Sequence, residues 1–141
     1  MTAEERDAFL GSERTCRVAS VGRDGAPHVS PLWFAWDGAS LWLTSVVKSQ
    51  RWTDLQRDNR VSVVVDAGHE FTDLRGVEVR GVAVPVGEVP RIGKPEPELE
   101  IPERLYADKY SSGSISHDGR HAWLRITPEK VVSWDFRKMA V

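Results

Sequence analysis

The sequence predicts a single mainly β domain, in which six or seven antiparallel strands and a few small helices close into a barrel. Short β-forming runs separated by turn signals predict the strands. The Asp-Gly pairs at 24–25 and 37–38 are typical of hairpins because both residues tolerate positive φ. Closure is the most economical arrangement because it leaves no exposed sheet edge. The length of 141 residues suits one domain spanning 1–141 rather than two.

Composition and charge exclude several classes of protein. Apolar residues make up 40% of the chain and charged residues 28%, which excludes long disorder. The formal net charge of -2 provides no strong field for nucleic acid or an acidic membrane, so any anion site must be local. The single cysteine, Cys16, forms neither an internal disulfide nor a Cys-rich zinc site. With a charged N-terminus and no bilayer-length apolar run, we expect a cytoplasmic protein.

The first half of the chain contains two helix signals and three strands. Thr2 and Glu5 form a capping box for a short helix that ends near Gly11 and lies over a barrel mouth. Three consecutive antiparallel strands are expected at Thr15–Val21, His28–Trp36 and Ser40–Val47. The apolar period then changes, and Ser49 is placed to cap a helix that extends to Asp58.

The second half resumes β structure around a proline-rich segment. Strands are expected at Val61–Asp66 and Val77–Val86, with a bulge or tight corner at Gly76 and Gly81. The segment Pro85–Pro102 holds five of the eight prolines, which predicts an exposed excursion.

Four further elements complete the predicted chain. A helix over Pro102–Tyr110 turns Leu105 and Tyr106 inward, and a loop follows over Ser111–Gly119. Two last strands, His121–Ile126 and Lys130–Phe136, are joined by a Thr127-Pro-Glu turn.

No self-contained catalytic motif occurs, whether a nucleophile elbow, a dinucleotide fingerprint or a phosphate loop. His117 and His121 have the spacing of a metal-binding helix pair, but Asp118-Gly119 between them favours a turn. His28 and His69 are isolated and lack the partner that a general base needs. We therefore expect no metal site and no catalytic side chain.

One local pattern suits an anion, at the junction of a strand and a helix. Amides at a helix N-terminus point outward with partial positive charge, Ser49 adds a hydroxyl, Arg51 a two-donor fork and Lys48 a point charge. Alone, the pattern more often marks a capped helix with solvated cations, so both interpretations remain open.

Tryptophans and one proline are the other candidates. Most of the six tryptophans are expected in the core or a subunit interface, namely Trp33, Trp36, Trp42, Trp52, Trp123 and Trp134. Trp33 and Trp42 lead to and from one hairpin, and either is a candidate to flank a planar ligand. Pro31 indicates an edge or bulge, whose backbone polar groups face either a ligand ring or solvent.

The order of these segments resembles the pyridoxamine 5'-phosphate oxidase-like split β-barrel family, and within it the actinobacterial branch that uses FMN or the deazaflavin coenzyme F420. The resemblance covers most of the chain. It rests on Asp24-Gly-Ala-Pro-His28, Ser30-Pro-Leu-Trp-Phe34, Asp37-Gly38, Leu41-Trp42, Lys48-Ser-Gln-Arg51, Leu55-Gln-Arg-Asp58, Arg60-Val61, Leu74-Arg-Gly-Val77, Val79-Arg-Gly81 and Ser133-Trp-Asp-Phe-Arg-Lys138.

The resemblance implies a homodimer with two cofactor sites at the subunit interface. The cofactor phosphate is then expected at Lys48, Ser49, Gln50 and Arg51. The flavin-like ring is expected along His28–Trp33 and Leu43–Val46, bordered by Pro31, Leu32, Trp33, Thr44 and Ser45. Asp54 stands where relatives usually have Asn, which adds a carboxylate near the phosphate. The segment Lys94–Pro102 is not a family hallmark and is placed to reshape a substrate pocket.

The leading hypothesis is an F420- or FMN-dependent oxidoreductase that moves a hydride between the cofactor and a small organic substrate. The branch resemblance favours F420 slightly. Because the cofactor supplies the chemistry, no catalytic triad is needed. The alternatives are a cofactor carrier without turnover and a haem-binding barrel, and oxidation of vitamin B6 itself is the least expected activity.

Overall fold

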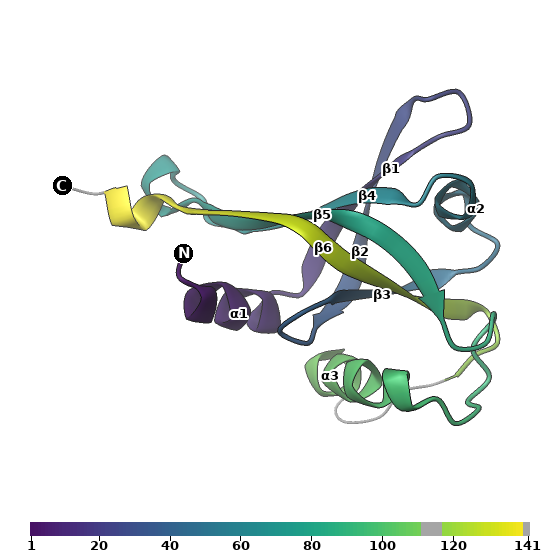
Figure 1. Cartoon of the computed structure of the whole chain (residues 1–141). Helices are drawn as coiled ribbons and strands as arrows, with labels where there is room; N and C mark the ends of the chain where they lie inside the picture. Colours follow the sequence, from purple (N-terminus) through teal and green to yellow (C-terminus); the bar gives the residue numbers. More distant parts are fainter. Residues whose placement is uncertain (111–116, 140–141) are drawn as a thin grey trace.

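The structure, a computed structural model, describes residues 1–110 and 117–139 and forms one closed antiparallel barrel (Figure 1). Its six strands are hydrogen-bonded in the order β1-β2-β3-β6-β5-β4. The strands are β1 (Thr15–Val21), β2 (Pro27–Trp36), β3 (Leu41–Val46), β4 (Arg60–Ala67), β5 (Arg75–Val86) and β6 (His121–Asp135). The predicted fold class and the first three strands are confirmed.

Three α-helices and three short 3-10 turns complete the described chain. The helices are α1 (Ala3–Ser12), α2 (Gln50–Arg57) and α3 (Glu100–Tyr110), and the 3-10 turns are η1 (Phe71–Asp73), η2 (Pro97–Leu99) and η3 (Phe136–Met139). The predicted capping box of α1 is present, because the Thr2 hydroxyl accepts from the Glu5 amide at 3.1 Å and the Glu5 carboxylate accepts from the Thr2 amide at 2.8 Å. Phe9 and Leu10 of α1 pack into the main apolar cluster of the barrel.

The last predicted turn is wrong, because β6 runs without a break from His121 to Asp135. Pro128 lies within the strand and pairs with Gly81, and the register shifts between Gly81 and Arg80. The bulge absorbs the proline without ending the strand. The bulge predicted at Gly81 is thus confirmed, and a Cβ there would collide with the carbonyl oxygen of Thr127.

The prediction that Pro85–Pro102 is an exposed excursion is also wrong in part. Arg91, Leu99 and Pro102 are buried, and the segment folds back over the outside of β3 and β6 before α3 begins. A second apolar cluster forms beneath it from Ala35, Trp42, Val86, Leu99 and Trp123, against which the predicted inward residues Leu105 and Tyr106 pack. The helix begins two residues before its predicted start. The loop predicted over Ser111–Gly119 lies mostly outside the described residues.

Four of the six tryptophans confirm the prediction of a core position, since Trp36, Trp42, Trp52 and Trp123 are buried. In residues 1–110 and 117–139 no helix is long and apolar enough to cross a membrane. The same residues contain no group of three or more side chains suited to hold a metal ion.

Candidate functional site

The barrel opens where β2 and β3 part, and we call this place the fork. The two strands pair only through Phe34–Trp36 and Leu41–Leu43. Before Phe34, β2 pairs with β1 alone, and after Leu43, β3 pairs with β6 alone. Pro31 therefore lies on a strand edge that no other described strand covers, as its missing N–H predicted. The backbone groups on that edge of β2 are available to a ligand.

The helix α2 begins beside the fork and is held there by its own cap and core contacts. The Ser49 hydroxyl accepts from the Trp52 amide at 3.1 Å, which confirms Ser49 as the N-cap. Trp52 and Leu55 are buried in the main cluster and fix the orientation of the helix. The first helical turn, which carries Arg51, is therefore held in place next to the two diverging strands.

Arg51 bridges the fork with its guanidinium. Its Nη1 donates to the Ser30 hydroxyl of β2 at 2.8 Å, and its Nε donates to the Ser45 hydroxyl of β3 at 3.3 Å. No carboxylate of the described residues lies within ion-pair distance of Arg51. Burial lowers the pKa of the Arg51 guanidinium because the charged form loses hydration. The site therefore holds a half-buried cation whose hydrogen-bond partners among the described residues are hydroxyls.

A cavity of about 260 Å³ lies against this cation, and we call it the fork cavity. Ser49, Gln50 and Arg51 line it from the helix side, and His28 and Ser30 line it from β2. The lining combines hydroxyls, an imidazole and the guanidinium at the N-terminus of a helix. Such an arrangement suits a phosphate, which gains hydrogen bonds and the attraction of the helix dipole together.

Asp54 adds one carboxylate to the cavity wall, and its charge is stabilised by hydrogen bonds from neighbours other than Arg51. Its Oδ1 accepts from the Gln50 side-chain amide at 2.8 Å and from Arg57 Nη2 at 3.1 Å. These hydrogen bonds, that from Gln50 above all, lower the pKa of Asp54 against the opposing effect of burial. Its Oδ2 is buried and has no hydrogen-bond partner among residues 1–110 and 117–139. The Gln50 amide is thereby engaged by Asp54.

The structure brings together most, but not all, of the residues predicted for the phosphate. Ser49, Gln50 and Arg51 share the fork cavity, and Ser45 joins them through its hydrogen bond with Arg51. Lys48 does not line that cavity. It is exposed and lines a separate cavity with residues of the proline-rich segment and of the turn before β6.

The residues predicted to border the ring lie on different faces. Pro31 and Trp33 are exposed on the outer face of β2, whereas Leu32 packs against the barrel core and Thr44 is half-buried opposite Trp123. Trp33 stacks on Tyr110 of α3, with ring centroids 4.3 Å apart and 5° between the planes. One face of the indole is therefore covered, and the side chain remains 44% exposed.

Ser30 was not singled out from the sequence, although it lies within the predicted ring-binding strand. Its partner Arg51 is 21 residues away, and neither residue alone carries a signal for the contact. Of the histidines, only His28 lines the fork cavity. His117 pairs with Glu103 and His121 with Asp118, so the two do not converge on a common point.

With this geometry established, comparison with known proteins identifies the family. The profile described as pyridoxamine 5'-phosphate oxidase matches residues 2–135, which is nearly the whole chain. The chain therefore belongs to the pyridoxamine 5'-phosphate oxidase family, whose split barrel the fork between β2 and β3 exemplifies.

Solved structures support the same fold. A conserved hypothetical protein from Mycobacterium tuberculosis is 30% identical, with a TM-score of 0.84 over 100% of this chain and 89% of that one. A structure named F420 reductase is 24% identical, with a TM-score of 0.65 over 89% and 94% of the two chains.

A FAD-binding protein from Mesorhizobium loti is 22% identical, with a TM-score of 0.70 over 94% of each chain. At these identities, the F420 reductase and the FAD-binding protein show the fold alone. No curated protein matches the sequence.

Proposed function

We propose that this protein is a flavin- or deazaflavin-dependent oxidoreductase that moves a hydride between a cofactor held at the fork and a small organic substrate. The observation that carries the proposal is Arg51, a half-buried guanidinium that donates to Ser30 and Ser45 and has no carboxylate partner among the described residues. A buried cation without a counter-ion is costly, and an anionic ligand would relieve that cost.

The fork cavity fits the phosphate of such a cofactor. Arg51 would supply a planar pair of donors, Ser49 a hydroxyl, and the first turn of α2 its outward backbone amides. Gln50 would reach the phosphate only by sharing or exchanging its hydrogen bond with Asp54. The phosphate would thereby be bound at a point fixed by the buried core of α2.

The ring of the cofactor would lie along the open edge of β2 and the adjacent part of β3. On the outer face it would meet the side chains of Pro31 and Trp33. Leu32 packs inward and Ser45 is buried, so these two residues and Thr44 would border the ring through their backbone. When bound, the ring supplies the hydride chemistry, so the protein needs only to hold it and to exclude water. The similarity to a structure named F420 reductase is a reason to test F420 first, with FMN as the second candidate.

A homodimer would complete the site, as the resemblance to split-barrel proteins implies. Strand alternation places Val29, Pro31 and Trp33 on one outer face of β2, where Val29 is 70% exposed. A second copy is the proposed cover because this face is continuous with the open edge that would hold the ring. Replacing Val29 with Glu should convert the dimer to monomer in sedimentation and weaken cofactor binding. A monomeric wild-type protein would contradict this part of the proposal.

Titration with FMN and with F420 tests the proposal directly, and it also selects the cofactor. Saturable binding of one of them, lost in Arg51→Ala, is the expected result. Lack of binding of both would overturn the proposal. A carrier would bind equally well, but its reduced cofactor would not be reoxidised faster by any candidate substrate, which separates binding from turnover.

We propose the cytoplasm as the location of this activity.

A haem-binding barrel is the second candidate, and it has one observation in its favour. His28 lines the fork cavity and is exposed, whereas His117 and His121 do not line it and each has one ring nitrogen hydrogen-bonded to a carboxylate. Haem iron needs an axial ligand, and His28 is the histidine placed to supply it. A Soret band that appears on haem addition and disappears in His28→Ala would favour this reading over the flavin one.

A further inference from the structure

A second cavity, of about 440 Å³, lies beside the end of β3. Its walls come from three separate parts of the chain: Val46, Val47 and Lys48 after β3, Pro90 from the proline-rich segment, and Gly119 and Arg120 before β6. The Val47 amide donates to the Arg120 carbonyl at 2.9 Å, which joins two of these walls. Lys48 immediately precedes the N-cap Ser49, so this cavity, here called the Lys48 cavity, neighbours the fork cavity.

The Lys48 cavity carries two cations, and no acid of the described residues pairs with either of them. Neither Lys48 nor Arg120 makes an ion pair with a described carboxylate. Asp118 is the nearest acid in sequence, but its Oδ1 accepts from the backbone amides of Arg120 and His121, and its Oδ2 meets the His121 ring. These bonds lower the pKa of Asp118 and hold the turn. Both side chains are exposed, so each is available to pair with an anion in the cavity.

The remaining walls of the cavity are apolar. Val46, Val47 and Pro90 are half-buried and offer no polar side-chain atom. Pockets for small organic molecules combine such apolar walls with a few placed polar groups that fix orientation. The chemistry therefore suits a compact molecule that has an apolar body and one anionic end.

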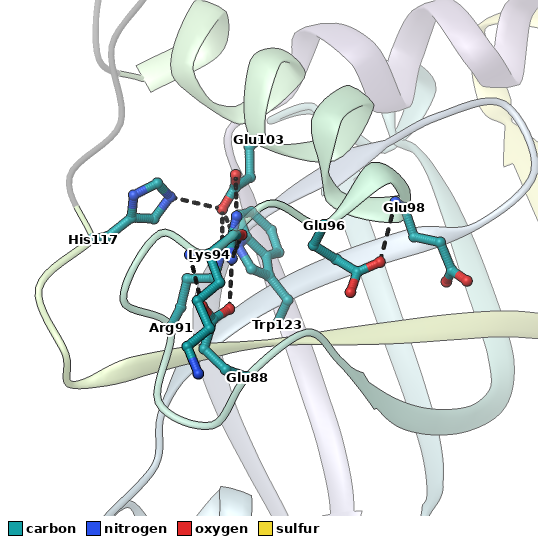
Figure 2. Close-up of polar contacts among 8 residues, drawn as sticks. All are labelled: Glu88, Arg91, Lys94, Glu96, Glu98, Glu103, His117 and Trp123. Carbon is teal, nitrogen blue, oxygen red and sulfur yellow. Dashed lines mark hydrogen bonds and ion pairs between the residues drawn. The ribbon is translucent and has the colours of Figure 1, made fainter.

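The wall that carries Pro90 is held by a buried ionic cluster, which Figure 2 shows. Arg91 donates through Nε and Nη2 to both oxygens of Glu103 at 2.9 and 3.1 Å, and through Nη1 to Glu88. Trp123 Nε1 also donates to Glu103 at 3.0 Å. The Arg91 amide donates to the His121 carbonyl at 2.8 Å, which ties the proline-rich segment to β6. The Lys48 cavity is thus walled by anchored chain rather than by a loose loop.

We propose that the Lys48 cavity binds the substrate, and that this substrate is a small carboxylic acid whose carboxylate lies between Lys48 and Arg120. That the bound acid is a substrate rests on the proposed function, in which the fork cavity holds the cofactor. The proposal also reassigns Lys48, which the sequence placed on the cofactor phosphate, to the anionic end of the substrate.

Benzoate is the probe, and benzamide is its neutral counterpart of the same shape. Titration of the isotope-labelled full-length protein, followed by amide NMR shifts, would locate and quantify binding without any turnover. Benzoate should shift the amides of Val47, Lys48 and Arg120, and benzamide should bind about fivefold more weakly because it loses an exposed ion pair. Added salt should weaken the binding of benzoate and leave that of benzamide unchanged.

Variants sharpen the test. Lys48→Met and Arg120→Met should each weaken benzoate about twofold, and the pair together should abolish its preference over benzamide. Lys130→Met, which removes an exposed lysine of β6 outside the cavity, is the matched control and should change nothing. Retained shift dispersion shows that each variant is folded.

The failure of this proposal differs from the failure of the proposed function. Equal affinities for benzoate and benzamide, shifts away from the Lys48 cavity, or unchanged binding in the double variant would overturn it even if FMN or F420 binds tightly. Benzoate binding with the expected variant effects would support an anion site even if neither cofactor binds, and only the proposed function would then fall.

Discussion

Two arginines in this molecule have opposite surroundings. Arg91 is 7% exposed and lies between the carboxylates of Glu88 and Glu103. Hydrogen bonds from Arg91 to Glu103 and Glu88 raise the pKa of its guanidinium against the effect of burial. Arg51 lies at the fork, where its partners in the described part of the chain are hydroxyls, and burial lowers its pKa.

The difference teaches which cation is structural and which is available to a ligand. The carboxylates of Glu88 and Glu103 neutralise the charge of Arg91, and these ion pairs hold the proline-rich segment against α3 and β6 (Figure 2). No described carboxylate neutralises the charge of Arg51, so that charge is available to an anionic ligand. Removing Arg91 should therefore damage the fold, and removing Arg51 should damage binding.

The largest expected effect is on stability in Arg91→Met. The substitution leaves the carboxylates of Glu88 and Glu103 partly buried without their cation, which should cost about 3–5 kcal/mol in the free energy of unfolding. Urea denaturation measures it. Arg104→Met, on the exposed side of α3, is the control and should change stability by less than about 0.5 kcal/mol. Equal losses in both variants would remove Arg91 from its structural role.

The next effect is on cofactor binding in Arg51→Ala. Loss of charged hydrogen bonds to the phosphate should weaken cofactor binding by about 1.5–3 kcal/mol, measured by fluorescence titration. Stability should hardly fall, because the variant also removes a desolvated cation. Lys48→Met should leave cofactor affinity unchanged, since Lys48 faces the other cavity. Unchanged cofactor affinity in Arg51→Ala would remove Arg51 from the site.

Asp54→Asn should change cofactor affinity in the opposite direction to Arg51→Ala. Asn keeps an oxygen that accepts from Gln50 and Arg57, but it removes the negative charge beside the proposed phosphate. Cofactor affinity should rise by about 1 kcal/mol, the size of a solvent-screened interaction between two charges. A fall in affinity would mean that the Asp54 carboxylate itself contacts the ligand.

The smallest effect is the acid dependence of stability. Partial burial acts to raise the pKa of Glu88, but hydrogen bonds from Arg91 and the Lys94 amide outweigh it and lower the pKa to about 2 from an ordinary 4.5. A lowered folded-state pKa stabilises the protein above the unfolded value, and that contribution is lost as pH falls from about 4.5 towards 2. Arg91→Met should flatten this part of the pH–stability curve, whereas Arg51→Ala should not.

Local signals predicted much of the fold. Asp-Gly turns gave the hairpins of β1 to β3, and the Thr2 and Ser49 caps gave the starts of α1 and α2. The continuity of β6 escaped prediction because the register that carries Pro128 past Gly81 is set by a neighbouring strand, not by local residues. The burial of Arg91 escaped for the same reason, since its partner Glu103 belongs to α3.

In the candidate site, too, residues adjacent in sequence were predictable and residues brought together by the fold were not. The run from Ser49 to Arg51 was predictable because a helix start and its cation are adjacent in sequence. Ser30 was not, because it meets Arg51 only through the divergence of β2 and β3. Lys48 was placed with its sequence neighbours, and the turn before α2 directs it to another cavity.

The most direct test compares each cofactor with its phosphate-free form, riboflavin for FMN and the deazaflavin chromophore for F420, in wild type and in Arg51→Ala. We predict that the wild type prefers the phosphorylated form and that this preference is largely lost in Arg51→Ala, while affinity for the phosphate-free form hardly changes. An undiminished preference in the variant would contradict the claim that Arg51 holds an anionic ligand at the fork.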